Sequence, residues 1–140
     1  MSEDERLLEV RRWLKYARED IPAAEAAISV RDFSPRHACW LAQQAAEKAI
    51  KAVLVLLQVD FPRHHDLDSL RNLVPKGWRV KEDHPDLAGL TEWAVESRYP
   101  GDWPDATDPD AKSAVEEAKA VWSSVCADFR IRGFDFEEIE

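Results

Sequence analysis

Three groups of polar residues in this sequence have the chemistry to bind an anion. The first contains two lysines, Lys48 and Lys51, set among glutamine and glutamate residues. On a helix, Gln44 and Lys48 lie one turn apart, as do Glu47 and Lys51, and such pairs stabilise an exposed helix by about 0.2–0.5 kcal/mol each. The alternative is that both lysines face a cleft and bind a phosphate group. The spacing is compatible with both interpretations.

The second group is the run His64-His65-Asp66. A histidine just before a helix can bind an anion together with the unpaired amides of the first helical turn. It can equally cap the helix or hydrogen-bond into the core. Adjacent histidines point apart on a helix, and no third ligand is spaced for zinc, so we expect no metal site.

The third group is Arg98 with Tyr99. An arginine can donate two parallel hydrogen bonds to a phosphate or a carboxylate. The structural alternative is an ion pair with Asp102, Asp105 or Asp108, which follow in the same predicted loop. Those aspartates lack the alternate spacing and the closing glutamate of an EF-hand, so we do not expect calcium.

Nothing in the sequence has the pattern of a catalytic nucleophile with its base. Cys39 and Cys126 fall on apolar helical positions, where a free cysteine behaves as a small hydrophobe, and we expect no disulfide between them because nothing indicates export. We therefore expect no catalytic residue, no metal and no cofactor. The predicted ligand-binding residues are Lys48, Lys51, His65, Arg98 and Tyr99.

The element that carries the two lysines is a predicted central helix over residues 36–57. Its apolar face is rich in alanine, which allows a neighbouring helix to approach closely, and its polar side forms a ridge. Trp40 falls on the polar side, and an aromatic residue there indicates a protein contact. We expect a homodimer. The predicted interface residues are Trp40, Gln43, Gln44 and Glu47.

The remaining helices follow from periodicity and end signals. A narrow apolar seam over residues 7–28 predicts a first helix, interrupted at Pro22 and restarted from a cap at Asp20. Asp66 caps a brief helix, a fourth helix opens at Asp83, and the last opens at Asp108 with Pro109. The predicted fold is all-α, an up-down bundle of four to five antiparallel helices over residues 1–132, with a loosely held acidic tail over residues 133–140.

The bulk composition limits the classes of partner. The 140 residues carry a formal net charge of −9, which opposes strong binding to nucleic acid, because that binding depends on lysine and arginine neutralising phosphates. No apolar run reaches the ~18 residues that a membrane helix needs. The first ten residues are acidic where a signal peptide would be basic, so we expect a cytoplasmic protein.

The order of these features resembles the HEPN domain family. The resemblance rests on the run AQQAAEKAIKA over residues 42–52, on His65-Asp66-Leu67 opening a short helix, and on Arg98-Tyr99-Pro100 before the last helix. It extends from Arg6 to Phe129. It implies a helical bundle that binds a nucleotide or phosphate and is paired with a small nucleotidyltransferase, often in a toxin–antitoxin-like system.

Ribonuclease members of that family carry an arginine, four to six further residues and then a histidine near the last helix. In this sequence no histidine follows Arg98, and the only pair at such spacing, Arg31 and His37, precedes the central helix. We therefore expect a binding module and not an enzyme. The alternatives are a metal-independent RNA endonuclease and an oligomeric scaffold without a ligand.

Overall fold

The computed structural model describes residues 1–30, 32–94, 101 and 104–140. Within those residues the chain forms six α-helices and a 3₁₀ turn, and no strand. In chain order the elements are α1 (Glu3–Ser29), α2 (Pro35–Leu56), α3 (Leu67–Asn72), α4 (Arg79–Glu82), α5 (Ala88–Thr91), α6 (Asp108–Ile131) and the 3₁₀ turn η2 (Glu137–Ile139). The predicted all-helical fold is confirmed.

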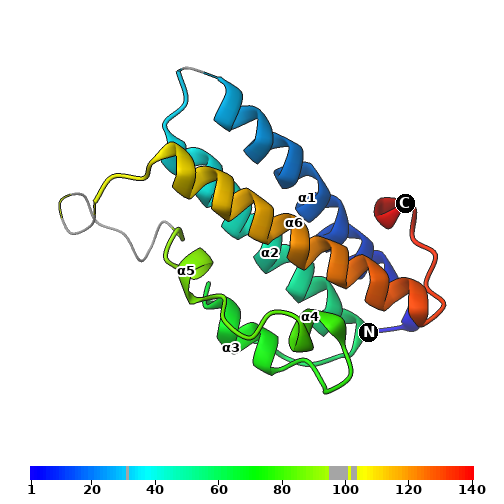
Figure 1. Ribbon diagram of the computed structural model, residues 1–140. Helices are drawn as coiled ribbons and strands as arrows, with labels where there is room; N and C mark the ends of the chain where they lie inside the picture. Colours follow the sequence, from blue (N-terminus) through cyan, green and yellow to red (C-terminus); the bar gives the residue numbers. More distant parts are fainter. Residues whose placement is uncertain (31, 95–100, 102–103) are drawn as a thin grey trace.

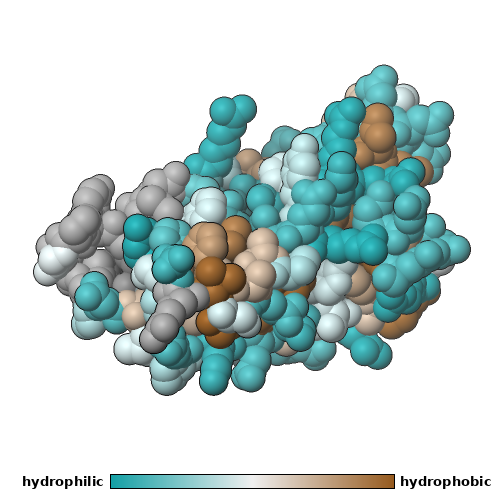
Figure 2. Space-filling view, turned by 90° about the horizontal axis from the view of Figure 1, so that it is seen from above, coloured by the Kyte–Doolittle hydropathy of each residue, from teal (hydrophilic) through white to brown (hydrophobic). Residues whose placement is uncertain are grey.

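The three long helices α1, α2 and α6 pack against one another, and the short helices lie along one side of this bundle (Figure 1). The centre of α2 is lined by alanines that are at most 1 % exposed, so its neighbours approach closely. Cys39 of α2 and Cys126 of α6 are both buried, as expected. Figure 2 shows one face of the molecule, on which hydrophilic side chains predominate and apolar ones gather in a cluster near the middle.

Helix α1 runs through Pro22 without a break, so the predicted interruption is wrong. Proline removes one backbone hydrogen bond, but Ile21 and Ala24 on either side of it are buried in the core and hold the helix together. Asp20 does not cap a restarted segment. Its carboxylate instead lies 2.6 Å from Nζ of Lys48 on α2 and ties the two helices together.

The short helices correct a second expectation. Asp66 caps α3 as predicted, accepting a hydrogen bond from the Ser69 amide. Asp83, however, ends α4 and does not open a helix. Pro85 disfavours helical geometry at the residue before it, which separates α4 from α5.

The last long helix begins close to the predicted position. Its cap is Thr107, whose hydroxyl and backbone exchange hydrogen bonds with Asp110 in a capping box, and Pro109 is its second residue.

The C-terminal segment is held against the bundle, so the expectation of a loosely held tail is wrong. Phe136 and Ile139 are 9 % and 3 % exposed, and the Phe136 ring packs edge-on against Phe129 of α6. Arg11 of α1 donates to the Glu138 carboxylate at 3.1 Å, and Arg130 donates to the Ile139 carbonyl. The acidic composition suggested that this segment would be solvated, but its apolar side chains, Phe136 and Ile139, are buried.

Candidate functional site

A buried polar cluster lies on the side of α2 that the sequence presented as an exposed ridge. Gln43, Glu47 and Lys51 are 0 %, 4 % and 8 % exposed. They follow one another at intervals of one helical turn, so their side chains form a continuous row. Together with His65 we call them the Glu47 cluster. The interpretation of this row as a solvent-facing ridge is therefore wrong.

The Glu47 carboxylate is the centre of the cluster. One oxygen, Oε2, accepts a hydrogen bond from Nζ of Lys51 at 3.0 Å. The other, Oε1, lies 2.6 Å from Nδ1 of His65 and accepts from the Gln43 amide at 3.1 Å. Burial raises the pKa of Glu47, but the hydrogen bonds from Lys51, Gln43 and His65 outweigh it, so the pKa lies below its usual value. Glu47 is therefore a carboxylate anion at neutral pH.

Two aromatic rings enclose the cation of the cluster. Nζ of Lys51 lies 5.5 Å from the ring centroids of both Trp13 on α1 and Phe61, and the two rings meet edge to face. The negative faces of such rings attract a cation, which offsets part of the cost of burying the ammonium group. Neither aromatic residue was predicted to belong to the site. Trp13 lies off the apolar seam of α1, and Phe61 belongs to a segment with no periodicity.

The turn after α2 explains how His65 reaches Glu47. Gln58 adopts a left-handed conformation with φ of 57°, and the Val59 amide bonds back to the Leu54 carbonyl at 2.9 Å. This geometry ends the helix and turns the chain back along it. The side-chain amide of Gln43 donates to the backbone carbonyl of His65 at 3.2 Å. Main chain and ring of His65 are thus both held by α2.

His65 is the member of the cluster nearest to solvent, with a side chain that is 32 % exposed. Because its Nδ1 is engaged by a buried carboxylate, the orientation of the imidazole ring is set by the protein. A carboxylate that orients a histidine is a common arrangement where the ring must bind an anion or move a proton. The cluster therefore has one accessible group on a rigid, buried support.

The other predicted ligand-binding residues are placed differently. Lys51 and His65 meet at Glu47, whereas Lys48 points toward α1, where it pairs with Asp20 and lies 5.9 Å from the ring centroid of Tyr16. One residue further along a helix is a rotation of about 100°, which separates Lys48 from the row of Glu47. Arg98 and Tyr99 lie outside the described residues.

The predicted interface residues differ in how far they are exposed. Gln43 and Glu47 are buried within the chain, so they present no surface to a partner. Gln44 is half-buried and donates to the Gln43 side chain at 2.8 Å. Trp40 is 37 % exposed and remains on the surface.

A second buried carboxylate, Asp128 on α6, has a different environment. It accepts hydrogen bonds from the backbone amides of Arg79 and Val80 at 2.8 and 3.0 Å, and Arg132 lies 3.5 Å away. These bonds hold the first turn of α4 against α6. Its donors are mainly fixed backbone groups, so we regard Asp128 as structural.

The described part of the chain gives no indication of a metal site. Within it, no group of three or more histidine, cysteine, aspartate or glutamate residues is arranged to hold a metal ion. In the same residues, no helix combines the length and the apolar character that crossing a membrane requires. Burial raises the pKa of the Cys126 thiol to about 11, so it is a poor nucleophile.

Comparisons with known proteins agree with this architecture. The model of the HEPN domain family matches residues 10–129. The crystal structure of TT1696 from Thermus thermophilus is similar, with 28 % sequence identity, a TM-score of 0.71, and coverage of 85 % of this chain and 97 % of that one. The structure of ST0689, an archaeal HEPN homologue, has 26 % identity and a TM-score of 0.64, covering 84 % of this chain and 95 % of that one. A comparison with curated proteins gives no match.

The family model covers most of the three long helices and all of the short helices between them, and the two solved structures share the overall fold. This chain belongs to the HEPN domain family.

Proposed function

We propose that this HEPN domain is a binding module that takes a nucleotide or another phosphate-bearing ligand at the His65 edge of the Glu47 cluster. The observation that supports the proposal is the 2.6 Å contact between His65 Nδ1 and Glu47, which fixes a partly exposed imidazole on a buried support. A ring held in one orientation loses little freedom on binding, so more of its interaction energy appears as affinity.

The charge of the cluster favours an anion. Lys51 neutralises Glu47 at 3.0 Å, so a proton on His65 gives the cluster a net positive charge. This charge is local, because the chain as a whole carries −9 and repels polyanions. A small phosphate-bearing ligand therefore suits the site better than a long nucleic acid.

The direct test is a titration of the histidine resonances with nucleoside phosphates at low salt. We expect the His65 signals to shift with saturation, and His65→Gln to weaken binding at least tenfold. His64→Gln is the matched control, since His64 is adjacent and its ring accepts a hydrogen bond from the Asp66 amide instead of contacting Glu47. A His65 signal that does not move at millimolar ligand contradicts the proposal.

We further propose that the module works with a nucleotidyltransferase-type partner, in a toxin–antitoxin-like pair. The support is membership of the HEPN family together with the resemblance of the site motifs. The test is to identify the neighbouring reading frame, to co-express its product, and to ask whether the two proteins co-purify. If the product of the neighbouring reading frame lacks nucleotidyltransferase motifs and does not bind this chain, the proposal of such a partner is contradicted.

A metal-independent RNA endonuclease is the second candidate, and one observation favours it. The contact between Glu47 and His65 has the geometry with which a carboxylate orients a general base. We still expect the purified chain to leave RNA intact, because no histidine follows Arg98 at the family spacing. RNA cleavage that is lost in both His65→Ala and Arg98→Ala would make the endonuclease the better assignment.

A further inference from the structure

A hollow between the start of α1 and the end of α2 is not used by the proposed function. Its volume is about 470 Å³, which is in the range of pockets that hold small molecules. Leu54 and Val55 of α2 give it apolar surface, together with Phe61 from the segment that follows. We call this hollow the Arg6 pocket. The other residues that line it are Met1, Arg6, Glu9, Gln58, Val59 and Asp60.

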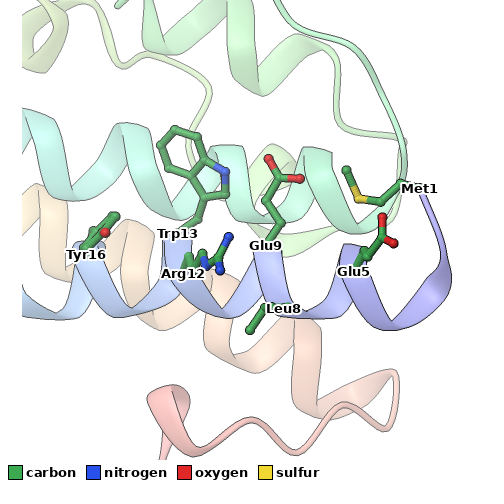
Figure 3. Close-up of a pocket in the computed structure, with 7 residues that line it drawn as sticks. All are labelled: Met1, Glu5, Leu8, Glu9, Arg12, Trp13 and Tyr16. Carbon is green, nitrogen blue, oxygen red and sulfur yellow. The ribbon is translucent and has the colours of Figure 1, made fainter.

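The Arg6 pocket adjoins a groove on the outer face of α1. The two hollows share Met1 and Glu9 (Figure 3). In this view the Glu9 side chain projects from α1 toward α2, whereas Leu8 points away from α2. The groove is lined only by residues 1–16, but the Arg6 pocket is lined by two segments that are far apart in the sequence. The shape of the Arg6 pocket is therefore set by the packing of α1 against α2.

Arg6 brings to the pocket a hydrogen-bond donor that the fold leaves without an acceptor. Its Nε atom is buried and has no hydrogen-bond partner among the residues that the structure describes. A buried donor in this state is costly, so an acceptor from a ligand would be favourable. Arg6 pairs with Glu3 at 3.6 Å, but the Glu3 side chain is 76 % exposed, so this pair holds Arg6 only weakly. The guanidinium group can therefore turn to bind a carboxylate through two parallel hydrogen bonds.

Two carboxylates border the same pocket. Glu9 lies about one helical turn after Arg6 on α1, and Asp60 lies in the segment that follows α2. Neither of them makes an ion pair within the described part of the chain. The pocket thus combines one cation, two carboxylates and apolar walls. A ligand that matches it carries both charges and an apolar group.

We infer that the Arg6 pocket binds a free α-amino acid with an apolar side chain. The carboxylate of the ligand pairs with Arg6 and supplies the acceptor that Nε lacks. Its ammonium group pairs with Glu9 and Asp60, and its side chain packs against Leu54 and Phe61. A fatty acid would place a third carboxylate beside Glu9 and Asp60, and an aliphatic amine would leave Nε without an acceptor. A zwitterion avoids both costs.

Phe61 makes occupancy of the pocket observable. Its ring meets the ring of Trp13 edge to face, with 6.4 Å between the ring centroids. A ligand that packs against Phe61 therefore changes the surroundings of the Trp13 indole, whose resonance is assigned with Trp13→Phe. Neither the His65 ring nor a phosphate group takes part, so the inference does not depend on the proposed function.

The test titrates the full chain with L-leucine and with L-phenylalanine, following the Trp13 indole resonance and the heat of binding. We expect saturation at millimolar concentration or below. Isocaproate lacks the ammonium group of leucine, isoamylamine lacks its carboxylate and glycine lacks its side chain, so each should bind at least tenfold more weakly. Arg6→Gln and Glu9→Gln should each weaken leucine binding at least tenfold, because each removes one of the charges that pair with the zwitterion.

Matched variants control for the loss of a charge. Arg12→Gln is the control for Arg6→Gln, and Glu116→Gln is the control for Glu9→Gln, since Arg12 and Glu116 are exposed and do not line the pocket. Both controls should bind leucine as the wild type does. Thermal melts show whether the variants are folded. If Arg6→Gln unfolds, Arg6→Lys replaces it and should also weaken binding, because lysine keeps the charge but not the two parallel donors.

Three outcomes would overturn the inference. The first is that neither amino acid saturates the Trp13 signal at millimolar concentration. The second is that leucine binds the folded Arg6 variant as tightly as it binds the wild type. The third is that isocaproate or isoamylamine binds as tightly as leucine, which would show that the pocket does not recognise a zwitterion.

Discussion

Glu47 and Asp128 are both buried carboxylates, and they differ in the kind of donor that holds each of them. Asp128 accepts hydrogen bonds from two backbone amides, and these donors cannot rotate or titrate. Glu47 is held by the side chains of Gln43, Lys51 and His65, of which two can change their charge. The carboxylate of Asp128 therefore holds the short helix α4 in place, whereas the carboxylate of Glu47 orients the ring of His65.

The comparison also shows what each environment stabilises. A carboxylate bonded to backbone amides adds to the stability of the fold and leaves nothing accessible to a ligand. A carboxylate bonded to ionisable side chains stabilises the fold less, because burying several charges together costs solvation energy. That cost is consistent with the binding role proposed for the Glu47 cluster. Substitutions at the two sites can test this distinction.

The largest effect should come from Asp128→Ala. It leaves the amides of Arg79 and Val80 without their acceptor, and because Val80 and Asp128 are buried we expect the free energy of unfolding to fall by about 3–5 kcal/mol. Denaturant unfolding followed by circular dichroism measures this change. Ligand binding by the folded fraction should be unaffected. A loss below about 1 kcal/mol would mean that water reaches these amides.

Glu47→Gln should have a smaller effect on stability and a larger one on binding. The substitution leaves Lys51 without its carboxylate, but the rings of Trp13 and Phe61 still face the ammonium group. We expect a loss of about 2–3 kcal/mol by the same measurement.

Lys51→Ala, which leaves Glu47 without its cation, provides the companion measurement for a double-mutant cycle. On the exposed ridge that the sequence suggested, the pair of Glu47 and Lys51 would contribute only about 0.2–0.5 kcal/mol, so Lys51→Ala would matter little. Its burial instead makes a loss similar to that of Glu47→Gln the expected result. Strictly additive effects of the two substitutions would show that the 3.0 Å pair contributes no coupling energy.

The pH dependence gives a third way to separate the two sites. The pKa of Glu47 is lower in the folded chain than its usual value of 4.5, so Glu47 stabilises the fold above that pH. This contribution should disappear as the pH falls below about 4.5 through the folded-state pKa. The stability difference between wild type and Glu47→Gln should thus shrink as the pH falls below about 4.5. Taking the difference between the two proteins removes the contribution of the other carboxylates, because both proteins contain them. A difference that grows in acid would reverse the assigned direction.

Lys48→Ala should have the smallest effect. Lys48 and Asp20 form a close pair, but both side chains retain access to water, and such pairs contribute about 0–1 kcal/mol. We expect a loss in this range and no change in ligand binding, measured by the same unfolding and titration experiments. A marked loss of affinity would place Lys48 in the ligand site after all.

Much of the fold could be predicted because local rules and tertiary packing agree there. The alanine face of α2, the Asp66 cap and the start of α6 all follow from spacing and end signals. The continuity of α1 through Pro22 could not be predicted in this way, because it depends on burial on both sides of the proline. The division between α4 and α5 likewise depends on the packing of very short segments.

The sequence pointed to two members of the Glu47 cluster but not to the way they are arranged. Lys51 and His65 were identified, yet Glu47 was assigned to a partner interface and not to the centre of the cluster. When a sequence is projected onto a helix, its polar residues are assigned to the side that faces solvent. Here the aperiodic segment containing Phe61 and His65 covers that side, together with Trp13. The indicator in the sequence was a row of polar residues that ends at Lys51, within the otherwise apolar second half of the helix.

The docked C-terminal segment has a consequence for the kinetics of folding. Arg11 and Glu138 are 127 residues apart in the chain, so their contact closes nearly the whole polypeptide into one loop. Contacts that need such a closure form after the local helices and their nearest pairings. Interactions absent from the transition state slow unfolding without accelerating folding. We therefore expect the C-terminal segment to dock late in folding and to lengthen the lifetime of the native bundle.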